Sequence, residues 1–384
     1  MRFRHPDRQE IHLGYCTNVH PAEDLAGILA QLETYAAAVR RRLDTAWLGL
    51  GLWLPAPVAA GLAGDPGQRR RLRNELAARG LEVFTLNGFP YRAFHAPVVK
   101  HAVYRPDWTT PERLRYTLDL ARVLADLLPD RAGRGSVSTL PLAWREPWPP
   151  AAGATAATRL AELAGGLAEL AAGTGRVVRV GFEPEPGCLV ETTGQAVAQL
   201  SGVDPAYLGV CLDLAHLACA WEEPATALAG LAAAGLPVVK VQVSAALAAA
   251  DPAAAADLLH GYAEPRFLHQ TRPAAGAGFD DLPEALAAGV PGPWRVHFHV
   301  PLHAEPAPPL GSTREVTAAG LAALLGGPAA GCDHFEVETY TWQVLPGPDR
   351  PDTPAALAAG IAAELGWARD RLLDFGLSAL EVTG

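Results

Sequence analysis

A chain of 384 residues, 49% of them hydrophobic, is large enough to bury one barrel-sized core or two average domains. The formal net charge of -10 argues against a nucleic-acid-binding surface, which is usually basic. The N-terminus is polar, no apolar run is long enough to cross a bilayer, and the five cysteines form no CxxC pair. We therefore expect a soluble, cytoplasmic protein with reduced thiols and no membrane span.

Eight short apolar runs predict β-strands that alternate with helices rich in Ala, Leu and Arg. The predicted strands cover residues 13–17, 47–54, 81–86, 136–140, 177–183, 208–213, 238–244 and 335–339. The predicted helices cover residues 21–42, 66–79, 111–128, 154–172, 194–200, 224–234 and 354–375. This alternation predicts a parallel sheet, and the number of units without a GxGxxG turn favours an α/β fold of the (β/α)8 TIM-barrel class over a doubly wound sheet.

One region interrupts the alternation. Residues 266–270 and 294–300 both have the composition of strands, and they lie between the seventh and the last predicted barrel strand. We expect a β-containing insertion at about residues 264–312 that forms a lid over the barrel mouth. The alternative is that 294–300 is itself the eighth barrel strand. No clear linker divides the chain, so we predict a single barrel domain over residues 1–384.

Four polar side chains mark the ends of consecutive predicted strands. Glu183 ends a strand that the following prolines and glycine cannot continue, and Asp213, Gln242 and Glu338 end the next three. Active sites of these barrels lie at the carboxyl ends of the strands. Three carboxylates and an amide oxygen form a hard ligand set, which predicts a divalent metal, Mn²⁺ or Mg²⁺ with Zn²⁺ as the alternative. A lone strand-end acid is often only solvated, but four in succession are less easily explained in that way.

Weaker candidates lie in the loops and on the polar strand faces. The candidates for substrate binding are His20, Asn87, Lys100, Arg105, Glu185, His216, Lys240 and His299. The chain has only two lysines, Lys100 and Lys240, and either Lys100 or Arg105 could hold a phosphate or a carboxylate. Asn18 lies beside His20 after the first strand. His297 and His299 share one strand face, as a metal-binding pair or as part of a polar lid.

Several motifs resemble known families. The runs GFEPEPG (181–187), CLDLAHLA (211–218), VKVQVS (239–244) and FEVETYTW (335–342) resemble the xylose-isomerase-like TIM-barrel superfamily of sugar isomerases and epimerases. The runs LGYCTNVHP (13–21), VFTLNGFPY (83–91), VKHAVYRPDW (99–108) and WRVHFHVPLH (294–303) resemble the EboE-like metabolite traffic protein family. The first resemblance implies that Glu183, Asp213, Gln242 and Glu338 hold the metal, with Glu183 and Glu338 as the catalytic acid/base pair. His299 is the alternative to Gln242 as the ligand that completes the metal site.

These resemblances imply a metal-dependent isomerase or epimerase. Its substrate would be a sugar- or cyclitol-like small molecule in a secondary-metabolite pathway, and proton transfer would pass through an enediolate. Partners from the same gene cluster and a homodimer are further expectations. A non-catalytic metabolite carrier on the same barrel is the first alternative. A phosphodiesterase of the endonuclease IV type is the second, which the acidic charge and the few strand-end histidines disfavour.

Overall fold

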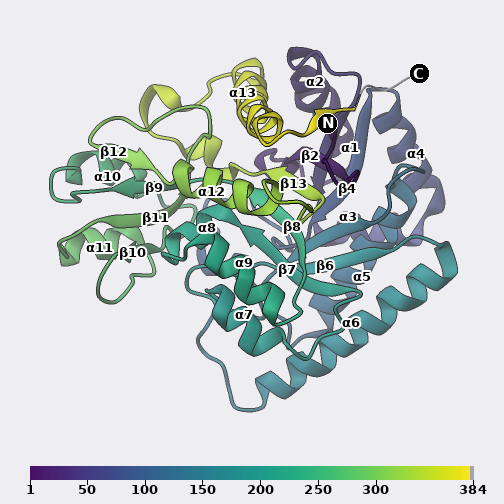
Figure 1. Ribbon diagram of the computed structural model, residues 1–384, viewed down its shortest axis with the longest axis horizontal. Helices are drawn as coiled ribbons and strands as arrows, with labels where there is room; N and C mark the ends of the chain where they lie inside the picture. The colour runs from purple at the N-terminus through teal and green to yellow at the C-terminus, as the bar shows by residue number, and fades with distance from the viewer. Residues whose placement is uncertain (381–384) are drawn as a thin grey trace.

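Eight parallel strands form a closed barrel in the computed structural model, which describes residues 1–380. In chain order they are β2 (Glu10–Cys16), β3 (Leu48–Trp53), β4 (Leu81–Asn87), β5 (Gly135–Thr139), β6 (Val178–Phe182), β7 (Leu208–Asp213), β8 (Val238–Val243) and β13 (His334–Val337). The last strand, β13, pairs with both β8 and β2 and so closes the barrel. The predicted TIM barrel is thus confirmed, with every predicted barrel strand in place (Figure 1).

Helices surround the barrel on its outside (Figure 1). They are α1 (Leu25–Gln31), a π-helical segment η2 (Leu32–Ala37), α2 (Ala38–Arg42), α3 (Ala56–Gly64), α4 (Pro66–Ala77), α5 (Pro111–Leu127), α6 (Ala152–Thr174), α7 (Thr193–Leu200), α8 (Leu214–Cys219), α9 (Pro224–Ala233), α12 (Arg314–Leu325) and α13 (Pro354–Asp374). Three of these helices were not predicted. The short α3 and α8 each begin within three residues of a strand end, so their few residues carry too little periodicity to be separated from the strand. The third, α12, follows the insertion, where no helix was expected. No helix within residues 1–380 is long and apolar enough to cross a membrane.

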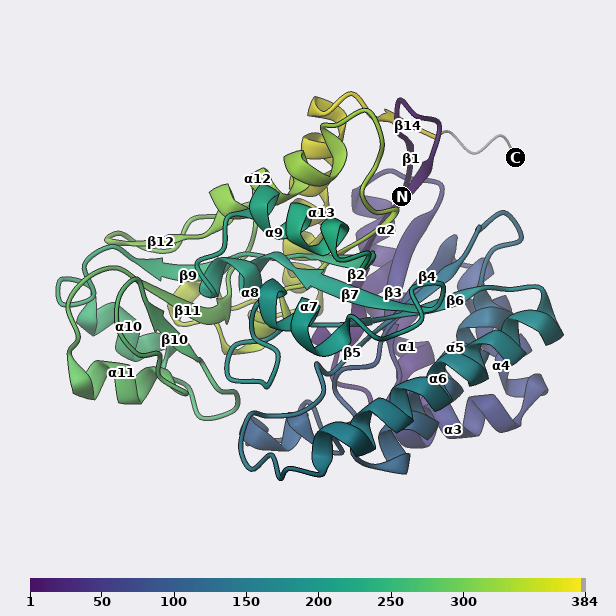
Figure 2. The same ribbon diagram turned by 60° about the horizontal axis from the view of Figure 1, so that its bottom comes forward.

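A second, antiparallel sheet lies to one side of the barrel, between β8 and α12 in the chain (Figures 1 and 2). Its strands are β9 (Ala246–Ala249), β10 (Thr271–Pro273), β11 (Trp294–His299) and β12 (Leu310–Ser312), in the order β10-β11-β9-β12. Two short helices, α10 (Ala256–Tyr262) and α11 (Leu282–Ala288), accompany it. Because β11 belongs to this sheet, residues 294–300 are not the eighth barrel strand, and the expected β-containing insertion is present.

Two details of the insertion differ from the prediction. Its sheet begins at Ala246, whereas the prediction placed the start of the insertion at about residue 264. The strand β9 was missed because its alanine-rich sequence has no alternating pattern of apolar and polar residues. Residues 266–270 form no strand. Their backbone groups bond elsewhere instead: the Arg266 carbonyl accepts from the amides of Val99 and Lys100, and the His269 amide donates to Asp281.

The amino end of the barrel is extended by two short strands. The strand β1 (Arg2–Arg4) pairs antiparallel with β2 on one side and with β14 (Ser378–Ala379) on the other.

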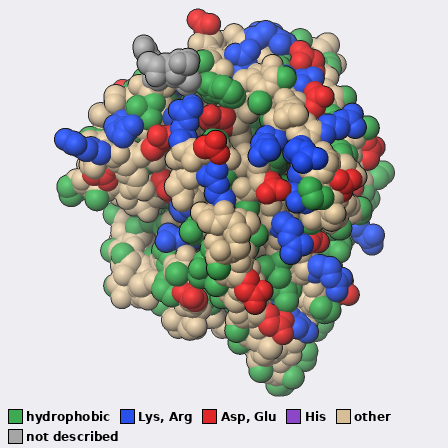
Figure 3. Space-filling view, turned by 90° about the vertical axis from the view of Figure 1, so that its right-hand side faces the viewer, with side chains coloured by type: hydrophobic (Ala, Val, Ile, Leu, Met, Phe, Trp, Pro, Cys, Tyr) green, Lys and Arg blue, Asp and Glu red, His purple; other side chains and the backbone are tan. Residues whose placement is uncertain are grey.

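On the face turned to the right of Figure 1, acidic and basic side chains are interspersed, without a large patch of one sign (Figure 3). This face offers no basic groove for a nucleic acid.

A buried ion pair occupies the barrel interior, one layer of side chains below the carboxyl ends of the strands. The ammonium group of Lys240 on β8 pairs with the Glu336 carboxylate on β13, and both side chains are inaccessible to solvent. Gly51 on β3 makes room for this pair, because a Cβ there would lie 1.2 Å from Glu336 Oε1. Burial opposes the charge of Lys240, but the adjacent Glu336 carboxylate keeps its pKa above the ordinary value.

The first prediction concerns this pair. Lys240→Met should lower the free energy of unfolding by about 3–5 kcal/mol, because it leaves the Glu336 carboxylate buried and unpaired. The double variant Lys240→Met/Glu336→Met should recover most of that loss. Urea denaturation measures both.

Lys100→Met is the matched control, since its partly exposed pair with Asp281 should be worth no more than about 1 kcal/mol. Equal losses in the two lysine variants would contradict a special structural role for Lys240.

Candidate active site

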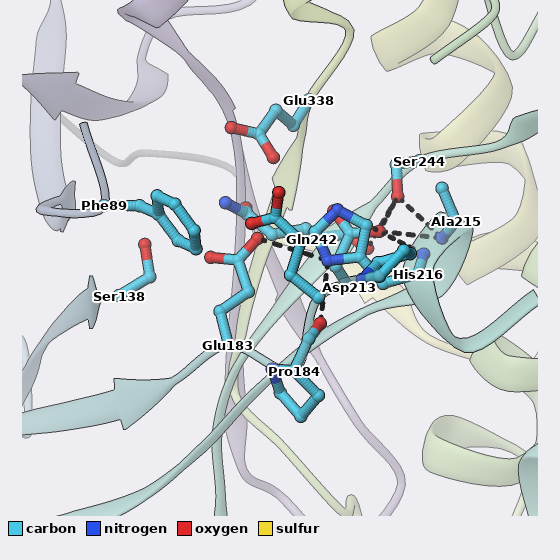
Figure 4. A network of polar contacts seen from close by, with 12 residues as sticks. Phe89, Ser138, Glu183, Pro184, Asp213, Ala215, His216, Gln242, Ser244 and Glu338 are labelled. Atoms are coloured by element: carbon cyan, nitrogen blue, oxygen red, sulfur yellow. Dashed lines mark hydrogen bonds and ion pairs between the residues drawn. The ribbon is translucent and has the colours of Figure 1, made fainter. Parts of the chain in front are cut away.

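The four predicted strand-end residues come together at the carboxyl end of the barrel (Figure 4). Glu183 follows β6 directly, and its amide donates to the Thr139 carbonyl at 3.0 Å before the prolines break the strand. Asp213 ends β7 and caps α8: its Oδ1 accepts from the amides of Ala215 at 2.8 Å and His216 at 2.9 Å. Gln242 lies one strand further, on β8, and Glu338 follows β13. All four are at least 95% buried.

Three of these four residues, and the nearby His299, keep buried polar atoms free for a ligand. Glu183 Oε2, Asp213 Oδ2 and both polar side-chain atoms of Gln242 are buried without a hydrogen-bond partner, and so is His299 Nε2. A buried polar atom without a partner costs about 1–3 kcal/mol, so several at one place indicate a site built for something that binds there. The donor set is rich in oxygen and negatively charged, and it fits a divalent cation.

The Glu338 carboxylate is held by two amides. Its Oε1 accepts from Asn18 Nδ2 at 2.7 Å and from Asn87 Nδ2 at 2.9 Å. Burial, together with the charges of Asp213 and Glu336, raises the pKa of Glu338 to about 8. Burial and the charges of Glu338 and Asp213 likewise raise the pKa of Glu183. These acids therefore require a cation or protons to share the site.

A small cavity of about 60 Å³ opens above the acids. Its polar lining comes from Asn18, Asn87, Lys100, Glu183, Glu185, His216, His297, His299 and Glu338. Its aromatic lining comes from Phe89, Phe94, Tyr104, Phe267 and Tyr340. This volume holds only a few water molecules, and therefore the enclosed space suits a small ligand.

The insertion and the loop after β4 cover this cavity. Tyr104, in the 3₁₀ helix η3 (Lys100–Tyr104), donates from its hydroxyl to Glu185 Oε1 at 2.7 Å. Gln270 in the insertion donates from Nε2 to the same hydroxyl at 2.8 Å. Lys100 pairs with Asp281 at the start of α11. Burial raises the pKa of Glu185 to about 8, although the Tyr104 hydrogen bond opposes the rise.

The structure brings some of the predicted substrate-binding residues together and separates others. Asn87, Lys100, Glu185, His216 and His299 line the cavity. The remaining three, His20, Arg105 and Lys240, are not among its lining residues.

Each of these three has a different environment. His20 lies 3.0 Å from the Tyr15 hydroxyl and stacks on Tyr35. The Arg105 side chain is 66% exposed and reaches toward Asp107. Lys240 precedes Gln242 by two residues on the same strand face and therefore lies one layer deeper, beside Glu336. Their placement gives no support to contact with a substrate.

Gln270 is a residue of this site that the sequence did not reveal. It lies in the segment predicted as an ordinary strand, and no motif marks it. Its role comes entirely from the fold, which places its amide between Tyr104 and His297.

Comparisons with known proteins agree with this architecture. Residues 48–288 match the family model described as xylose isomerase-like TIM barrel. No curated protein sequence gives a significant match.

Three solved structures illustrate the likeness. A candidate sugar phosphate isomerase/epimerase from Anabaena variabilis ATCC 29413 is 15% identical with a TM-score of 0.54, over 95% of this chain and 99% of that one. A xylose isomerase-like protein from Mycobacterium smegmatis in complex with magnesium is 15% identical with a TM-score of 0.52, over 94% and 98%. D-Psicose 3-epimerase with D-tagatose from Clostridium cellulolyticum H10 is 14% identical with a TM-score of 0.51, over 94% and 99%. At these identities the likeness shows the fold.

The second prediction concerns the crowded acids. In EDTA, Glu183→Gln should stabilise the protein by roughly 1 kcal/mol, because it removes one of three neighbouring carboxylates. Mn²⁺ at a hundred times its dissociation constant should stabilise the wild type by about 2.7 kcal/mol, and it should stabilise Glu183→Gln much less. Thermal unfolding with and without Mn²⁺ measures both effects.

Glu364→Gln is the control, because Glu364 is equally buried but accepts its hydrogen bonds from Thr339, Trp342 and the Leu302 amide, away from the cavity. This variant should keep the full response to Mn²⁺. A wild-type protein that Mn²⁺ and Mg²⁺ leave unchanged would contradict the metal site.

Proposed function

The chain belongs to the xylose isomerase-like TIM barrel family, and from that premise we propose that it is a divalent-metal-dependent isomerase or epimerase of a sugar- or cyclitol-like metabolite. The observation that carries the proposal is the pair of acids Glu183 and Glu338. Both line the same cavity, their carboxylates face the same space in Figure 4, and burial among like charges raises the pKa of each. Two such acids on either side of a carbon next to a carbonyl can remove a proton from one face and return it.

Different residues of the site would bind the metal, orient the catalytic acid and bind the substrate. Glu183, Asp213, Gln242 and Glu338 would hold the metal, which, when bound, supplies an electrophile that stabilises the negative oxygen of an enediolate. Asn18 and Asn87 fix Glu338 through Oε1 and so orient its carboxylate. Without a bound ion, burial and the charges of Asp213 and Glu336 raise the pKa of Glu338 to about 8, and a bound cation would lower it toward the range in which the carboxylate can act as a base at neutral pH. Glu185 and the Tyr104 hydroxyl offer further hydrogen bonds to substrate hydroxyls.

The lining of the cavity favours an uncharged polyol. Among the described lining residues Lys100 carries the one permanent positive charge, and Asp281 already pairs with it. Aromatic side chains form the rest of the wall, where they can stack on a sugar ring and exclude water. A phosphate or carboxylate would have to enter beside the carboxylates of Glu183, Glu185 and Glu338 without an unpaired cationic side chain to bind it. The resemblance of the motifs to the EboE-like family supports a place in a secondary-metabolite pathway.

The third prediction tests the proton transfer on a panel of ketohexoses and cyclitol ketones, so the natural substrate need not be identified first. The Mn²⁺-loaded protein is incubated with each compound in D₂O, and NMR follows deuterium entering beside the carbonyl. Glu183→Gln and Glu338→Gln should each slow the exchange by about 10²–10⁴-fold, because each removes one acid/base group.

Glu364→Gln should keep the exchange rate, which controls for the loss of a buried carboxyl elsewhere. Full exchange activity in both active-site variants would end the proposal. Tight binding of a polyol without any exchange would instead support a carrier.

A further inference from the structure

A larger cavity lies at the end of the barrel opposite to the candidate active site. Its volume is about 640 Å³, whereas the space above the acids measures about 60 Å³. Residues at the amino ends of β5, β6, β8 and β13 line it, together with residues of α9 and α12. Because pockets that bind small molecules usually measure about 300–1,000 Å³, the size of this cavity suits a small organic ligand.

Most of the cavity wall is apolar. The large apolar side chains in its lining are Val177, Leu228, Leu231, Leu236, Val238 and Leu324. Only four polar side chains of the described chain join them, and these are Gln9, Arg134, Arg179 and Asp333. An apolar wall with a few polar groups is the usual composition of a small-molecule site, in which the polar groups fix the orientation of the ligand.

The first of the two arginines has one nitrogen without a partner. Arg134 directly precedes β5, and its Nη2 donates to the Val239 carbonyl at 2.7 Å and to the Asp333 carboxylate. Its Nη1 is buried and has no hydrogen-bond partner among residues 1–380. A buried donor without a partner is costly, so this nitrogen indicates a place for an acceptor from outside the chain.

The second arginine has no carboxylate partner. Arg179 is the second residue of β6, and its Nε donates to the Ala206 carbonyl at 2.9 Å. It forms no ion pair within the described part of the chain, because the Asp333 carboxylate pairs with Arg134 instead. Burial and the charge of Arg134 lower the pKa of Arg179, although the charge of Asp333 opposes the shift. Two guanidinium groups thus share one carboxylate, which leaves one positive charge at the cavity uncompensated.

We propose that this cavity binds a small amphipathic anion, an alkyl or aryl carboxylate or phosphate, with its acidic group between Arg134 and Arg179 and its apolar part against α9 and α12. Guanidinium groups bind carboxylate and phosphate oxygens through paired hydrogen bonds. A single uncompensated charge beside an apolar wall disfavours a ligand with several charges. The ligand would not touch the candidate active site, and the inference does not rest on the proposed function.

The surroundings of the cavity favour a dissolved ligand over a lipid in a bilayer. A surface that inserts into a membrane exposes large apolar side chains. The large hydrophobic side chains that are well exposed within residues 1–380 are Val98, Trp221 and Leu373, and none of them lines this cavity.

Titration calorimetry on the full chain tests the inference with octyl phosphate, octanol and inorganic phosphate. Octyl phosphate should bind at one site per chain. Octanol and inorganic phosphate should bind at least roughly 10-fold more weakly, because each lacks one of the two groups that the cavity recognises. Arg179→Met should weaken the binding of octyl phosphate by about 10–100-fold, because it removes charge-assisted hydrogen bonds to the phosphate.

Ala232→Glu is a second variant that leaves both arginines in place. Ala232 is exposed on α9 and lines the cavity, so the fold should tolerate a glutamate whose carboxylate repels the anion and blocks binding. Arg176→Met is the matched control. Arg176 lies just before β6, pairs with Asp130 and is not a lining residue, so this variant should bind octyl phosphate as the wild type does.

Four outcomes would overturn the site. They are no binding of octyl phosphate by the wild type, equal binding by Arg179→Met and Ala232→Glu, octanol binding as tight as that of octyl phosphate, and inorganic phosphate binding as tight. Vesicles that contain phosphatidic acid distinguish a bilayer from a dissolved ligand. The wild type should not sediment with them, and sedimentation that Ala232→Glu abolishes would overturn the dissolved ligand.

These measurements need neither a metal nor a substrate of the barrel mouth. A protein without exchange activity that binds octyl phosphate through Arg179 would contradict the proposed function and leave this inference standing. A protein with full exchange activity that does not bind octyl phosphate would have the opposite meaning.

Discussion

The structure of the barrel mouth depends on the burial of like charges. Glu183, Asp213 and Glu338 share one water-poor space, and Glu336 adds a fourth acid just below them. The protein compensates only part of this charge. Lys240 neutralises Glu336, the amides at the start of α8 hold Asp213 through Oδ1, and two asparagine side chains hold Glu338 through Oε1.

The carboxylate oxygens that the protein leaves without a hydrogen-bond partner follow a pattern. Asp213 has one oxygen satisfied by the protein and the other, Oδ2, without a partner, and Glu183 Oε2 has none either. Such an arrangement stabilises the direction of each side chain while it keeps a lone pair for a ligand. Burying these oxygens without a partner lowers the stability of the fold. Such a cost is usual at binding sites, whereas a purely structural core would avoid it.

The elements that complete the mouth come from distant parts of the sequence. The loop after β4 brings Lys100 and Tyr104, and the insertion after β8 brings Asp281, Gln270 and the two histidines. Their mutual contacts close a cavity that the barrel strands alone would leave open.

The sequence predicted the parts of the site that follow from strand periodicity. Parallel strands that end in acids must present those acids at one edge of the barrel, so Glu183, Asp213 and Glu338 could be grouped without a structure. How deep each side chain lies in the barrel could not be predicted equally well. Lys240 shares a strand face with Gln242, yet it lies one layer below it and pairs with the Glu336 carboxylate. Gln270 and β9 were missed because a contact made only by the fold, and a strand made of alanines, leave no local pattern.

The charges of the neighbouring residues explain why an amide side chain suits position 242. In the proposed metal site three carboxylates would supply the charge that a divalent cation needs, and a neutral oxygen donor would complete a hard ligand set without adding to the repulsion. An imidazole there would have softened that set, and in this chain the imidazoles stand on the other side of Asp213, on α8 and β11.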